Sequence, residues 1–99
     1  MRRTNNSVRR TKFDIIDDIL SAIRTGKNRK TQIMYRAKLS FEQLQGSKKN
    51  GSQGYIPFLK EKGLIIMKND NSGNSTYFEV TDKGKEFMKG YENLKGLIQ

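Results

Sequence analysis

The sequence predicts one mostly α-helical domain that carries a small β-hairpin, an α+β fold. Three observations support this prediction. A chain of 99 residues is long enough for one hydrophobic core but leaves too little for a second. Apolar residues recur at helical spacing in several segments of the chain. Between residues 64 and 80, two β-prone runs flank a cluster of turn-forming residues.

The first predicted helix covers residues 12–25. Its apolar side chains form one broad stripe at helical spacing, made by Phe13, Ile16, Leu20 and Ile23. Thr11 stands three residues before Asp14, where its side-chain oxygen can cap the first turn, and Gly26 follows the last turn. Residues 1–11 combine Arg with Thr, Asn and Ser and contain no acid, which predicts a flexible basic arm.

Two shorter helices are expected next. The second begins near Thr31 as its N-cap and ends before Ser40, with Ile33, Met34 and Ala37 facing inward. Ser40 and Gln43 then form an S-x-x-Q capping box, which predicts a third helix that holds Phe41 and Leu44.

An insertion interrupts the third helix. Residues 46–54 contain three Gly and no apolar side chain, so they cannot extend a packed helix cheaply and are predicted to form a mobile loop. Apolar helical spacing resumes at Tyr55, with Pro57 tolerated in the first turn, and Gly63 ends the segment.

The C-terminal part predicts a hairpin and one more helix. Residues 64–68 and 76–80 are expected to be strands joined by a turn, and Thr81 caps a helix over 81–99. Apolar residues of this helix follow the coiled-coil interval and form a candidate dimerisation seam, namely Phe87, Tyr91, Leu94 and Ile98. Three Gly residues at 84, 90 and 96 weaken the helix.

The order of these elements is that of a winged helix-turn-helix. Residues 12–80 are predicted to form this domain, in which 46–54 is an inserted loop and 64–80 is the hairpin called the wing. Residues 81–99 would follow as a dimerisation helix. Only 33% of the residues are apolar, which favours extra burial by self-association into a homodimer.

The charge predicts a polyanionic partner. Lys and Arg number 20 against 10 Asp and Glu, a net charge of +10. The excess lies mainly in residues 1–12 and 24–38 rather than being spread evenly, which favours a directed electrostatic footprint for nucleic acid. No uninterrupted apolar run approaches the length of a membrane span, so we expect a cytoplasmic, nucleoid-associated protein.

Composition argues against catalysis. The chain contains no His and no Cys, which excludes zinc fingers, disulfide frameworks and the commonest general base. Asp14, Asp17 and Asp18 share one helix and could in principle approach a metal ion. The simpler interpretation is that these acids complement the helix dipole. No enzymatic activity, metal or cofactor is therefore predicted.

Much of residues 13–94 resembles archaeal winged-helix DNA-binding proteins. The resemblance is carried by Ile19-Leu20, Ala22-Ile23, the run from Lys30 to Leu44, Tyr55-Ile56, Phe58-Leu59, the run from Lys62 to Ile65, Tyr77, Val80-Thr81, Lys83-Gly84 and Phe87. That family includes 10a-type chromatin proteins, which dimerise through an antiparallel C-terminal helix, and sequence-specific repressors. The resemblance implies DNA binding. Family members have two residues where this chain has ten between Leu44 and Tyr55, so about eight are extra inside the recognition helix.

Candidate DNA contacts fall in four groups. The start and outer face of the second helix can meet phosphates, and amides or cations near the third helix can contact base edges. The wing tip suits a minor groove or its phosphates, as does the arm. The candidates are Arg29, Lys30, Thr31, Gln32 and Arg36; Gln43, Gln45, Lys48, Lys49, Asn50 and Gln53; Lys68, Asn69, Asn71 and Asn74; and Arg9 and Arg10. Two alternatives stay open: Gln43 only closes its capping box, and the loop is solvated without base contact.

Aromatic residues are expected mostly to pack in the core rather than stack on bases, because they fall on apolar stripes. They are Tyr35, Phe41, Tyr55, Phe58, Tyr77, Phe78 and Phe87.

These observations predict a homodimeric, sequence-specific double-stranded DNA-binding protein that regulates transcription. Chromatin-type or plasmid-partition DNA binding is the nearest alternative, and a winged helix that binds protein is a more distant one. The sequence shows neither the target DNA sequence nor a pocket for a small-molecule effector.

Overall fold

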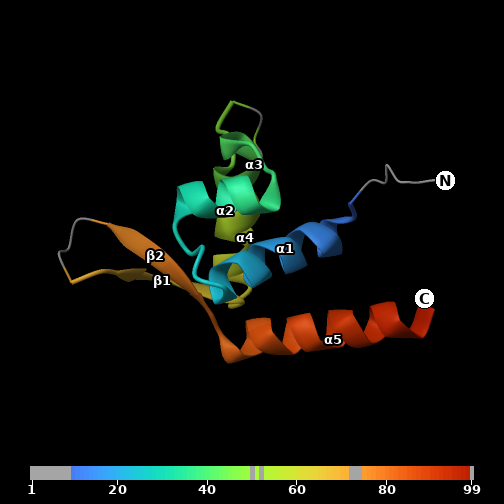
Figure 1. The fold of residues 1–99 in the computed structure, drawn as a ribbon. Coiled ribbons are helices and arrows are strands. Elements are labelled where there is room, and N and C mark those ends of the chain that lie inside the picture. The colour runs from blue at the N-terminus through green and yellow to red at the C-terminus, as the bar shows by residue number, and fades with distance from the viewer. Residues whose placement is uncertain (1–9, 50, 52, 72–74, 99) are drawn as a thin grey trace.

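The structure, a computed structural model, describes residues 10–49, 51, 53–71 and 75–98. It confirms the predicted mostly helical fold with one antiparallel two-stranded hairpin (Figure 1). The elements in order are α1 (Lys12–Arg24), α2 (Lys30–Ala37), α3 (Phe41–Gln45), α4 (Tyr55–Glu61), β1 (Ile65–Asn69), β2 (Thr76–Val80) and α5 (Asp82–Ile98). No helix in these ranges has the length and apolar character needed to cross a membrane.

Helix α1 lies at the centre of the fold, between α2 and α5 (Figure 1). The predicted cap is present: the Thr11 hydroxyl oxygen accepts the Asp14 N–H at 3.1 Å, and the Asp14 carboxylate accepts the Thr11 N–H at 2.8 Å. The stripe from Ile16 to Ile23 is buried with residues from α2, α3, α4 and both strands, and Phe87 and Met88 of α5 pack against this core, whereas Phe13 is largely exposed. The buried core consists of Ile16, Ile19, Leu20, Ile23, Ile33, Ala37, Leu39, Leu44, Ile56, Leu59, Leu64, Ile65 and Phe78.

Helix α2 begins earlier than predicted. Its N-cap is Arg29, and the helix starts at Lys30, so the expectation that Thr31 is the N-cap is wrong. The physical reason lies at Gln32, whose side-chain oxygen accepts the Arg29 N–H at 3.2 Å and so caps the helix two residues upstream. The helix ends at Ala37, and its C-cap residue Lys38 adopts a left-handed conformation (φ 58°).

The hairpin packs against α1 and is tied to the chain before α2. Its register pairs Ile65 with Val80 and Asn69 with Thr76. Phe78 is fully buried, and its N–H donates to the Asn28 carbonyl at 2.9 Å. The base of the wing is therefore part of the hydrophobic core, whereas its outer end projects away from the helices (Figure 1).

Helix α5 joins the hairpin through its first turn. The Thr81 hydroxyl accepts the Gly84 N–H at 3.1 Å, which confirms the predicted cap, and donates to the Gly63 carbonyl at 2.6 Å. Gly84 is buried, and a Cβ there would lie 2.4 Å from the Leu64 carbonyl oxygen. The glycine thus permits the close approach of α5 to Leu64, in the connection between α4 and β1, whereas the sequence alone marked Gly84 only as a weakness of the helix.

Helix α5 then runs along α1 on the side away from α2 (Figure 1). Phe13 and Phe87 bring their ring centroids to 6.2 Å, and Tyr91 stacks on Phe87 at 6.1 Å. Partial burial at this contact is the main reason that the pKa of Asp17 is raised above its usual value; Lys95 opposes the shift, and Asp18 and Glu92 add to it.

Two aromatic residues depart from the expected core packing. Tyr35 is 79% exposed and Phe41 is 56% exposed, so the prediction is wrong for both. Ile33 and Ala37 occupy the inward face of α2, which leaves Tyr35 on its outer side. In α3 only Leu44 points inward, because five residues provide little more than one turn.

The structure also separates α3 from α4. Helix α3 ends at Gln45, Gly46 is its C-cap, and Gly54 is the N-cap of α4. The two glycine backbones touch: a Cβ on Gly54, whose φ is 82°, would lie 2.2 Å from the Gly46 nitrogen. The connection between α3 and α4 therefore begins and ends at adjacent points, Gly46 and Gly54.

Candidate nucleic-acid interface

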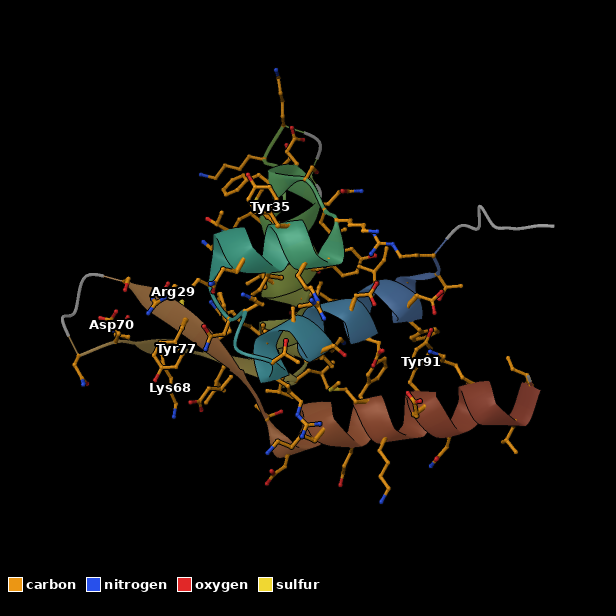
Figure 2. The ribbon with its side chains drawn as sticks, viewed as in Figure 1. Arg29, Tyr35, Lys68, Asp70, Tyr77 and Tyr91 are labelled. Atoms are coloured by element: carbon orange, nitrogen blue, oxygen red, sulfur yellow. The ribbon has the colours of Figure 1, made fainter. Side chains whose placement is uncertain are left out.

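The predicted contact residues are distributed over the α2 start, the α3–α4 junction and the outer hairpin. Figure 2 shows Arg29, Asp70 and Tyr77 gathered at the hairpin, whereas Tyr35 lies beside α2 and α3. Each group has a different set of partners within the protein, and these partners decide which side chains remain available to a ligand.

Arg29 is held by the wing. Its guanidinium donates to the Ser75 hydroxyl at 2.9 Å and to the Thr76 carbonyl at 3.2 Å, and it pairs with the Asp70 carboxylate at 3.4 Å. The Tyr77 ring lies 5.9 Å from the guanidinium carbon. Ser75 also donates to Asp70, which closes the group. These contacts join the N-cap of α2 to both sides of the hairpin tip, and we call this set the Arg29 cluster.

The rest of the α2 start presents exposed polar groups. Thr31, Gln32 and Arg36 are exposed and Lys30 is half-buried. Lys30 and Arg36 make no ion pair with any other described residue. Tyr35, with Lys27, Gln32 and Arg36, lines a surface hollow of about 310 Å³. This face can therefore offer two cations and an aromatic ring to a polyanion.

Two of the predicted amides near α3 and α4 are used inside the protein. The Gln43 side-chain oxygen accepts the Ser40 N–H at 2.8 Å, and the Gln43 N–H donates to the Ser40 hydroxyl at 3.1 Å. The capping box that the sequence predicts is therefore formed. Gln53 donates from its amide nitrogen to the Glu61 carboxylate at 3.0 Å.

Gln45 differs from these amides, because its side chain makes no hydrogen bond to the described part of the chain. It lines a second hollow of about 450 Å³ together with Phe41, Gly46, Ser47, Lys48 and Gly51. Lys48 and Lys49 are exposed and form no ion pair with another described residue. Asn50 lies outside the described residues.

The hairpin places its candidates on the exposed strand and at the tip. Lys68 pairs with Glu79 on the other strand at 3.0 Å, and this hydrogen bond raises the pKa of the Lys68 ammonium. Asn69 and Asn71 are exposed, and Asn74 lies outside the described residues. The tip thus offers neutral amides next to a cation that is already paired.

Of the arm candidates, Arg9 lies outside the described residues and Arg10 is engaged by the domain. The Arg10 guanidinium pairs with Asp18 at 2.9 Å and donates to the carbonyls of Ala37 and Lys38. It therefore stabilises the negative end of α2.

Sequence reasoning missed Tyr35 and Phe41 as exposed groups of the helix-turn-helix. The signal was present for Tyr35, since Ile33 and Ala37, four residues apart, already define the inward face of α2. Among residues 10–49, 51, 53–71 and 75–98, no group of three or more acidic, His or Cys side chains could hold a metal ion.

Comparisons with known proteins agree with this arrangement. Residues 9–99 match the family model described as winged helix-turn-helix. An uncharacterized protein of Methanocaldococcus jannaschii is 34% identical over 90 residues, which cover 91% of this chain and 78% of that protein. The crystal structure of Sso10a-2, a DNA-binding protein from Sulfolobus solfataricus, has the same fold with a TM-score of 0.62 at 22% identity, and the match covers 89% of this chain and 81% of that one.

Proposed function

The chain belongs to the winged helix-turn-helix family, and from this premise we propose that it binds double-stranded DNA. The observation that carries the proposal is the set of cations on the helix-turn-helix that no described acid neutralises, namely the half-buried Lys30 and the exposed Arg36, Lys48 and Lys49. Unpaired cations on one side of a small domain favour a polyanion, since phosphate contacts release counterions. The DNA-binding description of the similar Sulfolobus protein supports the same partner.

Most of the acids lie outside the helix-turn-helix cations, although the exposed Glu42 is part of α3. Six of the ten acids lie on α1 and α5, namely Asp14, Asp17 and Asp18 in α1 and Asp82, Glu86 and Glu92 in α5, and α5 runs along the side of α1 that faces away from α2. The stretch between Asp18 and Glu42 contains no acid. The protein thus has a cationic side, and DNA would approach it from the helix-turn-helix.

In the proposed complex each element has a separate task. The first turn of α2, with Thr31 and Lys30, contacts phosphates through backbone N–H groups and the ammonium. Helix α3 enters the major groove, and Gln45, Lys48 and Lys49 lie near base edges and the backbone. The wing tip, through Asn71, follows the minor groove. DNA binding alone, without a catalytic step, gives each of these residues a role.

We further propose a sequence-specific role in transcription regulation, with the protein acting as a homodimer. Specificity needs groups that can contact base edges, and the side-chain amide of Gln45, which forms no hydrogen bond with a described residue, is one. The dimer would use the outer half of α5, where Leu94, Leu97 and Ile98 are exposed. Chromatin-type binding is the second candidate, because exposed cations bind phosphates without regard to sequence.

One titration tests both roles. Purified protein is titrated against a random duplex pool at about physiological salt, and the bound fraction is sequenced. Binding with an enriched motif is expected, with two half-sites about 34 Å apart for a dimer. Binding without enrichment would establish the chromatin-type role instead. Absence of binding would overturn the proposal. A variant with Lys30, Lys48 and Lys49 changed to Gln should bind less tightly and with a weaker salt dependence, whereas Lys85→Gln on α5 should not.

A further inference from the structure

Phe41 is an aromatic side chain that folding leaves in solvent. It is the first residue of α3 and is 56% exposed, although the next core residue of that helix, Leu44, is fully buried. The Ser40–Gln43 capping box determines how α3 begins and does not involve the ring. The phenyl group is therefore on the outer face of α3 because the local structure holds it there.

One helical turn later, Gln45 shares this face. Residues four apart on a helix have Cβ atoms about 5–6 Å from each other. Phe41 and Gln45 accordingly line the same hollow, together with Lys48. The hollow thus presents together an apolar ring, an amide that forms no hydrogen bond with a described residue, and an ammonium that forms no ion pair with a described residue.

This combination matches the chemistry of one base pair. In the major groove an A·T pair displays the thymine C5-methyl group, an apolar contact, and the adenine N6 and N7 atoms, which a glutamine amide can bind in a bidentate manner. A G·C pair displays no methyl group. The distance between the two side chains fits one base pair or two adjacent ones, since successive pairs rise by about 3.4 Å.

Resting on the proposed DNA binding, we propose that Phe41 and Gln45 together recognise an A·T base pair. Phe41 packs against the thymine methyl group, Gln45 binds the adenine edge, and Lys48 contacts a neighbouring phosphate. Phe41 is then a specificity-determining residue. The prediction that its ring packs in the core leaves no such role for it.

The test removes one methyl group from the DNA. From a duplex selected out of the random pool, each thymine in turn is replaced by deoxyuridine, which lacks only the C5-methyl. The wild-type protein should lose about fourfold in affinity at one thymine per half-site. Phe41→Ala should bind the thymine and deoxyuridine duplexes equally, and Phe41→Leu should keep part of the preference. In the same way, replacing adenine by 7-deazaadenine should lower the DNA affinity of the wild-type protein but not that of the Gln45→Ala variant.

Tyr35→Ala is the matched control, because Tyr35 is also an exposed aromatic of the helix-turn-helix but lines a different hollow. It should keep the full thymine preference. Circular dichroism and thermal melting of each variant show that it is folded. If wild-type affinity is unchanged by deoxyuridine at every position, if Phe41→Ala retains the preference, or if no motif is enriched, the inference is overturned while DNA binding stands. If no duplex is bound at all, the proposed function itself fails.

Discussion

Arg29 connects two parts of the chain that are more than forty residues apart. The sequence predicts it as a DNA contact, and that remains a prediction. In the structure its donors are directed at Ser75, Thr76 and Asp70, so a second role is to position the wing relative to α2. The two roles predict opposite changes in DNA affinity when Asp70 loses its charge.

If Arg29 positions the wing, Asp70→Asn should lower DNA affinity by about three- to tenfold, because the cluster loses its charge-assisted contact. This would occur even though the substitution removes a negative charge near the DNA. Glu79→Gln is the control, since Glu79 is another wing acid but lies outside the Arg29 cluster; its loss should leave the affinity unchanged or raise it slightly. Fluorescence anisotropy with one labelled duplex measures both. An increase for Asp70→Asn equal to that of Glu79→Gln would instead assign Arg29 to a phosphate.

At the scale of elements, α5 contains glycines with opposite roles. Gly84 is buried, and a Cβ there would lie 2.4 Å from the Leu64 carbonyl oxygen and 2.6 Å from Val80. Gly90 and Gly96 would have no neighbour within 4 Å. Helical propensity alone treats the three positions alike, whereas the packing of Gly84 against Leu64 and Val80 distinguishes the first.

We expect Gly84→Ala to destabilise the fold by about 1–3 kcal/mol, because backbone must move to admit the methyl group. Gly90→Ala should stabilise it by about 0.5–1 kcal/mol through helical propensity. Urea unfolding followed by circular dichroism gives both values. A loss of stability for Gly90→Ala would mean that another surface approaches α5 closely at that point, and equal effects at both positions would contradict the packing described for Gly84.

The elements differ in how far the sequence determines them. The order of helices and strands, the Thr11 and Ser40 caps and the interruption after Gln45 follow from local patterns, and the structure agrees with them. The start of α2 does not follow from a local pattern, since it depends on the Gln32 side chain rather than on a standard capping residue. The engagement of Arg29 and Arg10 could not be predicted, because their partners are distant in sequence. Phe41 is exposed because α3 has only five residues and buries one side chain, that of Leu44.

At the scale of the whole molecule, α5 packs on the domain through only part of its apolar side. Its first half packs on α1 through Phe87, and Tyr91 extends this contact toward α1 (Figure 2). Beyond Tyr91, Leu94 is 56%, Leu97 81% and Ile98 77% exposed. The predicted seam is therefore divided, with Phe87 already in contact with the core and Leu94 and Ile98 available to a second chain.

Replacing Leu94 and Ile98 together with Asp should convert a dimer into a monomer, because two carboxylates would have to be buried in an apolar contact. Light scattering of the free protein gives the mass directly. Asn93→Asp is the control, since it adds a carboxylate at an exposed position of the same helix. A mass unchanged by the double substitution would place the interface elsewhere, and a wild-type monomer would contradict the proposed homodimer.

The contact between Gly46 and Gly54 has a consequence for how such chains can diversify. Since the two backbones meet, the segment between them could be shortened, lengthened or exchanged without displacing α3, α4 or the core. The entropic cost of a longer loop grows only slowly with its length. This junction is therefore a permissive insertion point within the proposed DNA surface, because Lys48 and Lys49 lie in the inserted segment, and changes there could alter the target preference while the core is kept.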